Sequence, residues 1–229
     1  MDLKIHQIYG YPVGVVHLNK NLYNKKKIIK TIEDNFKINK ERNKWDKNYS
    51  LNIHHAYNDW QNPLYKQVDF KTLIPLYHKV IKNYLKKLFK TPNYQYEFEI
   101  TNYTCMYKSG YMGDHVHPCE FTIVHYIQFD PLCHKSTCFL SPYPHAAYFD
   151  QLNKNLLPVL NEKNSMNSWA FREWHWGIKE DDLIIHPGLM RHKVNLQTST
   201  NKNRITIVSN VTIAGADSLM FSDDHTVRI

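Results

Sequence analysis

The sequence lacks any long apolar run. No segment approaches the roughly 18–20 consecutive apolar residues of a membrane-spanning helix, and no apolar leader segment stands at its start. We therefore expect a cytoplasmic protein without a membrane partner, whose thiols are reduced.

Cysteine and glycine are also scarce, with 4 and 7 residues among 229. Cys133-His134 and Cys138 could form half of a zinc site, but their spacing matches no standard zinc pattern. The chain has no internal repeat and no low-complexity linker, so we expect a single domain over residues 1–229. Tyrosine is abundant, with 16 residues, and favours strands.

Acidic residues are outnumbered, which gives a formal net charge of +8. The lysines concentrate in the first hundred residues, at positions 25–27 and at Lys82, Lys86, Lys87 and Lys90. We interpret them as solvated helix faces and do not expect a nucleic-acid partner. The remaining basicity would suit anionic substrates.

The hydrophobic pattern changes at Pro92. Before it, residues 1–18 are predicted to be extended, 22–37 and 68–89 helical, and 40–66 polar and irregular. After it, strands are predicted near 94–100, 121–129, 136–140, 169–176, 183–186 and 204–213. Strands without alternating helices favour a sandwich or barrel over a parallel sheet, with the N-terminal helices (residues 1–92) against the β core (93–215).

One candidate metal motif precedes the strand at 121–129. His115 and His117 are separated by one residue, so in an extended chain both imidazoles lie on one side and can share a metal. With 14 histidines in the chain, chance pairs are expected. His54-His55, for example, is adjacent rather than alternate, and we interpret it as structural or surface.

Two further segments complete a pattern. A polar turn leads into an apolar strand, then Pro187-Gly188 and His192, and a strand beginning at Arg204 and reaching Asn210 follows. Arg204 lies twelve positions after His192, which suffices for a short hairpin, so we expect their two strands to be neighbours.

Together these three segments resemble the 2-oxoglutarate and iron(II)-dependent oxygenases, closest to the prolyl-hydroxylase-like group common in marine phages and bacteria. The resemblance covers about residues 94–213. It implies a double-stranded β-helix, or jelly roll, and an enzyme that uses Fe(II), 2-oxoglutarate and O2 to hydroxylate a small-molecule or peptidyl substrate. If the protein is phage-encoded, its location would be the host cytoplasm.

The resemblance also implies roles for individual residues. His115 and His192 would be iron ligands, and Arg204 would pair with the distal carboxylate of 2-oxoglutarate, which a guanidinium can bind in a bidentate way. Tyr126 falls where related hydroxylases place a tyrosine that binds the same carboxylate. Tyr107 and Asn210 are further candidates for the cosubstrate pocket.

One position departs from the family's pattern. The family's metal-binding carboxylate normally stands two residues after the first histidine, and here that residue is His117. Three explanations are open. His117 is itself a ligand and gives a three-histidine site, or Glu120 or Asp114 supplies the carboxylate, or else His117 stands outside the coordination shell or the metal site is degenerate. Geometry favours His117, with Glu120 as the alternative.

Two other functions remain open. A cupin-like metalloprotein could use the same histidines without 2-oxoglutarate, and a jelly-roll binding protein could have lost its metal. His125 and His186 are interpreted as structural, with His125 facing away from Tyr126. The insertion at 143–167 is a candidate lid over the substrate.

Overall fold

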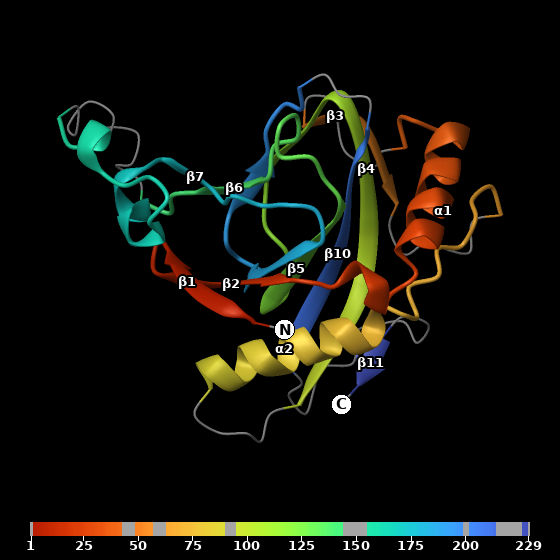
Figure 1. Ribbon diagram of the computed structural model, residues 1–229, viewed down its shortest axis with the longest axis horizontal. Helices are drawn as coiled ribbons and strands as arrows, with labels where there is room; N and C mark the ends of the chain where they lie inside the picture. The colour runs from red at the N-terminus through yellow and green to blue at the C-terminus, as the bar shows by residue number, and fades with distance from the viewer. Residues whose placement is uncertain are drawn as a thin grey trace.

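The computed structural model describes residues 2–42, 49–56, 63–89, 95–143, 155–198, 202–213 and 226–228. Two helices lie against one side of a strongly curved antiparallel sheet (Figure 1). The elements are β1 (Lys4–Ile8), β2 (Tyr11–His17), η1 (Lys20–Leu22), α1 (Lys25–Ile38), β3 (Ser50–Ala56), α2 (Ile74–Leu88), β4 (Tyr96–His115), β5 (Phe121–Gln128), β6 (Thr137–Leu140), η3 (Leu157–Val159), η4 (Ser165–Ala170), β7 (Glu173–His175), β8 (Asp182–Pro187), β9 (His192–Val194), β10 (Arg204–Ile213) and β11 (Thr226–Arg228).

The strand order is that of a jelly roll. The path runs β1-β2-β8-β5-β10-β4-β9-β6-β7, and every pairing along it is antiparallel. Strand β4 is 20 residues long, and its first part pairs with β10 whereas its end pairs with β9. It therefore belongs to two walls, a major sheet of β8-β5-β10-β4 and a minor sheet of β4-β9-β6-β7. The predicted fold class is confirmed.

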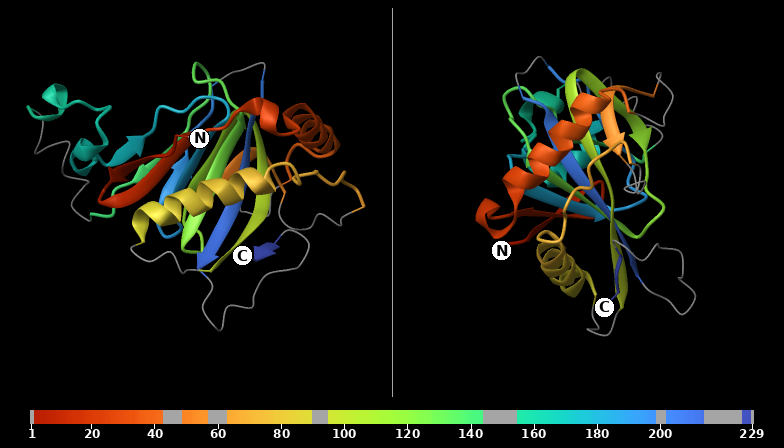
Figure 2. Two further views of the ribbon diagram at one scale, coloured as in Figure 1. Left: turned by 60° about the horizontal axis from the view of Figure 1, so that its bottom comes forward. Right: turned by 90° about the vertical axis from the view of Figure 1, so that its right-hand side faces the viewer.

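Along each strand of the major sheet, successive side chains point alternately into two apolar layers. On β5, Ile123 and Ile127 belong to the core between the sheet and the helices, whereas Val124 and Tyr126 belong to a core inside the jelly roll. Helices α1 and α2 cover the outer face of this sheet (Figure 2) and bury their apolar stripes against it. No helix among the described residues is long and apolar enough to cross a membrane.

The strand predicted near 169–176 is limited to β7, because η4 occupies Ser165–Ala170. Two further differences from the sequence-based expectations bear on the site. The segment expected to be irregular contains β3, which pairs with β4 over Ser50–Ala56 and carries the buried His54 and His55. The strands of His192 and Arg204 are not neighbours, because β9 pairs with β4 and β6 in the minor sheet whereas β10 lies between β4 and β5 in the major sheet. The connection crosses from one wall to the other instead of closing a hairpin.

Candidate functional site

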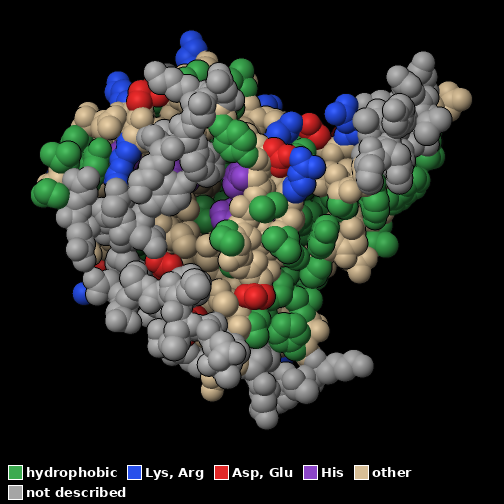
Figure 3. All heavy atoms as spheres, turned by 180° about the vertical axis from the view of Figure 1, so that it is seen from behind, with side chains coloured by type: hydrophobic (Ala, Val, Ile, Leu, Met, Phe, Trp, Pro, Cys, Tyr) green, Lys and Arg blue, Asp and Glu red, His purple; other side chains and the backbone are tan. Residues whose placement is uncertain are grey.

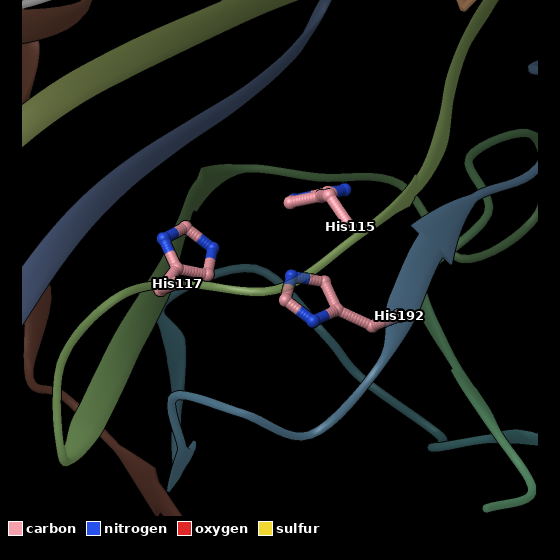
Figure 4. Close-up of side chains that lie close together, drawn as sticks. All are labelled: His115, His117 and His192. Atoms are coloured by element: carbon pink, nitrogen blue, oxygen red, sulfur yellow. The ribbon is translucent and has the colours of Figure 1, made fainter.

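Three histidines converge where the two walls meet. His115 ends β4 and stands opposite His192 in the β4–β9 pairing, and His117 follows in the next loop. Each of the three offers a ligand atom, and these atoms all lie within 4.8 Å of one another (Figure 4). The ring centroids of His115 and His192 are 4.2 Å apart, and His117 lies 5.2 Å from His192. The spacing fits imidazoles that share one metal ion.

The loop that carries His117 is held against the β8–β9 turn by close backbone contact. The amide of His117 donates to the carbonyl of Gly188 at 2.9 Å, and the Gly188 amide donates to the carbonyl of Glu120 at 2.9 Å. A Cβ on Gly188 would lie only 2.1 Å from the Cys119 carbonyl oxygen, so the glycine is required for this approach. Local backbone structure thus positions His117 beside His192.

Backbone carbonyls orient two of the rings. The Nδ1 atoms of His115 and His192 lie 2.8 Å from the carbonyl oxygens of Gly113 and Met190. A carbonyl only accepts, so each Nδ1 carries the proton and Nε2 is the basic nitrogen. The same arrangement orients metal-binding histidines in proteins generally.

Burial keeps these imidazoles neutral. It lowers the pKa of His115 and of His192, and burial together with neighbouring His186 and His115 lowers the pKa of His117 to about 3. A metal binds neutral imidazole, so the cluster does not need to lose protons to bind one at neutral pH.

The two carboxylates considered as ligands lie outside the histidine cluster. The Glu120 Oε2 atom accepts from the Ile213 amide at 3.1 Å, and Asp114 forms an ion pair with Arg191. Neither belongs to the group of ligand atoms formed by the three histidines. Among the described residues the cluster is therefore an all-histidine donor set.

The histidines open into a cavity of about 670 Å³ between the two walls. In the view from behind Figure 1, histidine side chains are visible within a hollow of the surface (Figure 3). The volume of the cavity falls in the range of about 300–1,000 Å³ that is typical of ligand sites. Besides the three histidines its lining includes apolar and hydroxyl side chains, two asparagines and one arginine, among them Val124, Thr137, Val208, Asn102, Asn210 and Arg204.

Arg204 is the cation of this cavity. It is only 1% exposed, its Nε donates to the Lys135 carbonyl at 3.0 Å, and its guanidinium lies 5.2 Å from the centroid of the Tyr126 ring. None of the ion pairs within the described residues involves it. Burial lowers its pKa, and a buried charge without a carboxylate is costly. Such a group is a candidate site for an anion.

Of the other residues predicted to bind the cosubstrate, two lie at the cavity or against Arg204 and one lies away from both. Asn210 lines the cavity, and its buried Oδ1 has no hydrogen-bond partner. Tyr126 lies beneath Arg204, and its hydroxyl donates to Thr137 Oγ1 at 2.7 Å and accepts from the Thr137 amide at 3.0 Å. Tyr107 does not line the cavity, because its hydroxyl contacts Glu41 and Asn52 and its ring packs on Phe36.

Among the histidines of the cavity, His55 corrects the sequence-based interpretation of His54-His55 as structural or surface. His55 on β3 is buried, lines the cavity, and has its Nδ1 3.2 Å from Thr104 Oγ1. The alternation of Ile53 and His55 within a strand was the available signal, and the adjacent His54 obscured it. His186 is fully buried as expected, with Nδ1 2.8 Å from the Pro187 carbonyl oxygen and its ring 5.0 Å from that of His192.

The insertion does not cover the histidines with its described part. Residues 155–167 include η3 and the start of η4, and η4 packs on β1, where Ser168 Oγ accepts from the Tyr9 amide at 2.8 Å. None of these residues lines the cavity. Residues 144–154 lie outside the described residues.

No family profile and no curated protein matches this sequence. Solved structures with a similar fold include a prolyl hydroxylase from Trichoplax adhaerens in complex with a hypoxia inducible factor oxygen degradation domain peptide (10% identity, TM-score 0.48, covering 87% of this chain and 83% of that one). Others are a 2OG-Fe(II) oxygenase family oxidoreductase from Burkholderia pseudomallei (12%, 0.47, 86% and 84%) and a Pseudomonas putida prolyl-4-hydroxylase (9%, 0.47, 89% and 93%).

Proposed function

We propose that this protein is a non-haem Fe(II), 2-oxoglutarate-dependent dioxygenase that hydroxylates a small-molecule or peptidyl substrate. One observation carries the proposal. A cluster of three neutral imidazoles and a buried guanidinium without a carboxylate partner line the same cavity. The first feature suits a transition metal and the second an anion, so a ligand with a metal-binding end and a distal carboxylate would satisfy both.

In this proposal His115, His117 and His192 hold the iron. Three histidine ligands would leave coordination positions of the ion open for cosubstrate and oxygen. The Nδ1 contacts of His115 and His192 fix the rings before the metal arrives. When bound, the metal supplies the oxygen activation that protein side chains cannot provide.

Arg204 would bind the distal carboxylate of 2-oxoglutarate. Its planar fork offers two parallel N–H donors to a carboxylate, and the Tyr126 ring and the Lys135 carbonyl restrain it. Thr137 lines the cavity and is positioned by Tyr126, so we assign Tyr126 an indirect role. Asn210 offers an unpartnered amide oxygen to the ligand or substrate.

The apolar lining has a chemical purpose of its own. Met112, Val124, Val194 and Val208 contribute apolar side chains to the cavity lining. Apolar surroundings lower the local dielectric, and this would strengthen the attraction between Arg204 and a carboxylate and orient the cosubstrate toward the histidines.

One observation favours a second candidate function. The donor set contains no carboxylate, so it also suits a cupin-like metalloprotein that does not use 2-oxoglutarate. In a cupin-like protein Arg204 would have no 2-oxoglutarate carboxylate to bind. The two candidate functions therefore differ in whether 2-oxoglutarate binds to the metal-loaded protein.

The test is turnover of the cosubstrate. Purified protein supplied with Fe(II), 2-oxoglutarate and O2 should release succinate even without a substrate, as slow uncoupled turnover. Arg204→Met should reduce this rate at low cosubstrate concentration. The proposal fails if metal-loaded protein consumes no 2-oxoglutarate and also does not bind it under anaerobic conditions.

A further inference from the structure

A second group of potential metal ligands lies in the minor sheet, away from the cavity. Cys138 on β6 stands opposite His175 on β7, and Glu173 is two residues before His175 on the same strand. The residues between them, Phe139 and Trp174, belong to the core inside the jelly roll. Because strand side chains alternate, Cys138, Glu173 and His175 share the opposite, outer face of this wall.

The three donor atoms are already close together. Cys138 Sγ lies 3.4 Å from Glu173 Oε2, which lies 3.9 Å from His175 Nε2, and all three atoms are within 4.8 Å of one another. Zinc–ligand bonds of about 2.3 Å to sulfur and about 2.1 Å to nitrogen or oxygen, in tetrahedral geometry, would place neighbouring donors roughly 3.4–3.6 Å apart. Shifts of well under 1 Å in two of the three donor atoms would bring the Cys138–Glu173 and Glu173–His175 separations to these values.

The charges around the cluster also favour a divalent ion. Lys193 Nζ binds Glu173 Oε1 at 2.6 Å, so the other carboxylate oxygen is the one that faces the thiol and the imidazole. A thiolate and a carboxylate would together neutralise a divalent cation, while Lys193 would keep its contact with the outer oxygen. Asn195 Nδ2 lies 3.4 Å from His175 Nε2 at the edge of the cluster, and a metal bound to Nε2 would take the place of this contact.

An open face completes the site. Glu173 and His175 also line a groove of about 610 Å³ whose walls include Phe171, Trp174 and Trp176. In the proposed site a water or another small ligand would take the fourth coordination position, as in zinc sites with three protein ligands.

We propose that Cys138, Glu173 and His175 form a second metal site, selective for a borderline-soft divalent ion of the Zn²⁺ class. Thiolate and imidazole favour such ions over Mg²⁺ or Ca²⁺. Binding forms a metal–sulfur bond and breaks the S–H bond of Cys138, so one proton leaves to solvent per ion and no oxidation state changes. The ion would join β6 to β7, the three-residue strand at the end of the sheet path.

Cobalt(II) is the probe that separates this site from the histidine cluster, because only a thiolate ligand gives sulfur-to-cobalt charge-transfer absorption in the near ultraviolet. Titration of metal-free protein should produce this absorption with one equivalent at the site. It should persist in His192→Ala, which damages the first cluster, and in Cys119→Ser, the control for a thiol near His117. It should vanish in Cys138→Ala.

Two further readouts protect the test against misfolding of the Cys138 variant. His175 is exposed, so His175→Gln should fold normally and weaken zinc binding at this site at least about 10-fold in chelator competition. Zinc addition to His192→Ala should release about one proton, measured with a pH indicator. A cobalt complex without thiolate absorption at saturation, or absorption that survives in Cys138→Ala, would overturn the proposal.

Discussion

Opposite faces of the major sheet carry two buried polar clusters that differ in how completely their atoms are paired. On the outer face, His125 Nδ1 accepts from the Tyr77 hydroxyl at 2.9 Å, and Lys25 binds Asp181 at 2.7 Å and Glu180 at 2.8 Å. On the inner face, Arg204 has no carboxylate partner among the described residues, and the Asn210 Oδ1 atom has no hydrogen-bond partner. Both faces are buried, so burial alone does not explain the difference.

The contrast separates structural from ligand-binding polar groups. Buried polar atoms that stabilise a fold are almost always paired, because an unpaired one costs about 1–3 kcal/mol. The outer cluster anchors α1 and α2 to the sheet and follows that rule. The inner cluster departs from it where a metal and an anion would complete the pairing. The two clusters should therefore respond differently to mutation.

The largest effect is expected for Lys25→Met on the outer face. Removing this ammonium leaves Asp181 buried without its cation, and breaking a buried ion pair in this way costs about 3–5 kcal/mol. Chemical denaturation should show that loss, while metal affinity per folded molecule stays unchanged. A stability within 1 kcal/mol of the parent protein's would show that the ion pair does not anchor the helix.

On the inner face, His117→Ala should weaken metal binding instead of folding. We expect a loss of more than about 100-fold in Fe(II) or Co(II) affinity, since removing a partner of a metal ligand alone typically costs 10- to 100-fold. Glu120→Gln is the matched control and should bind metal normally, because its carboxylate accepts from the Ile213 amide. The reverse result in calorimetric titrations would assign the third ligand to Glu120.

Arg204→Met should separate cosubstrate binding from metal binding. Charge-assisted hydrogen bonds contribute about 1.5–3 kcal/mol, so 2-oxoglutarate affinity should fall about 10- to 100-fold with metal affinity unchanged. The free protein should not lose stability, because removal of the buried guanidinium leaves no buried carboxylate without its cation. An unchanged cosubstrate affinity would remove Arg204 from the site.

The smallest effect concerns pH. Burial, together with the charges of Lys25 and His17, lowers the pKa of His125 to about 3, against about 6.5 in the unfolded chain. As the pH falls from 7 to 5, only the unfolded chain takes up this proton, so stability decreases by about 2 kcal/mol from this residue. His125→Gln should lose correspondingly less stability over that interval in urea titrations. Equal losses in both proteins would exclude His125 as a source of acid sensitivity.

Sequence reasoning predicted which face of a strand a side chain occupies better than it predicted which strands pair. Periodicity on β5 correctly placed His125 and Tyr126 on opposite faces, since alternation is a local property of a strand. It did not predict that β9 and β10 belong to different walls, because pairing partners depend on the whole sheet. His55 was interpreted as structural or surface for the same reason, because its place in the cavity depends on β3 pairing with β4.

An anaerobic absorption titration would show whether the cavity holds a metal and an anionic cosubstrate together. Protein loaded with one equivalent of Fe(II) should develop visible metal-to-ligand charge-transfer absorption that saturates at one equivalent of 2-oxoglutarate. The absorption should be absent in His192→Ala and should require higher cosubstrate concentrations in Arg204→Met. Stoichiometric Fe(II) binding without any response to 2-oxoglutarate would contradict the account and favour a metalloprotein of the cupin type.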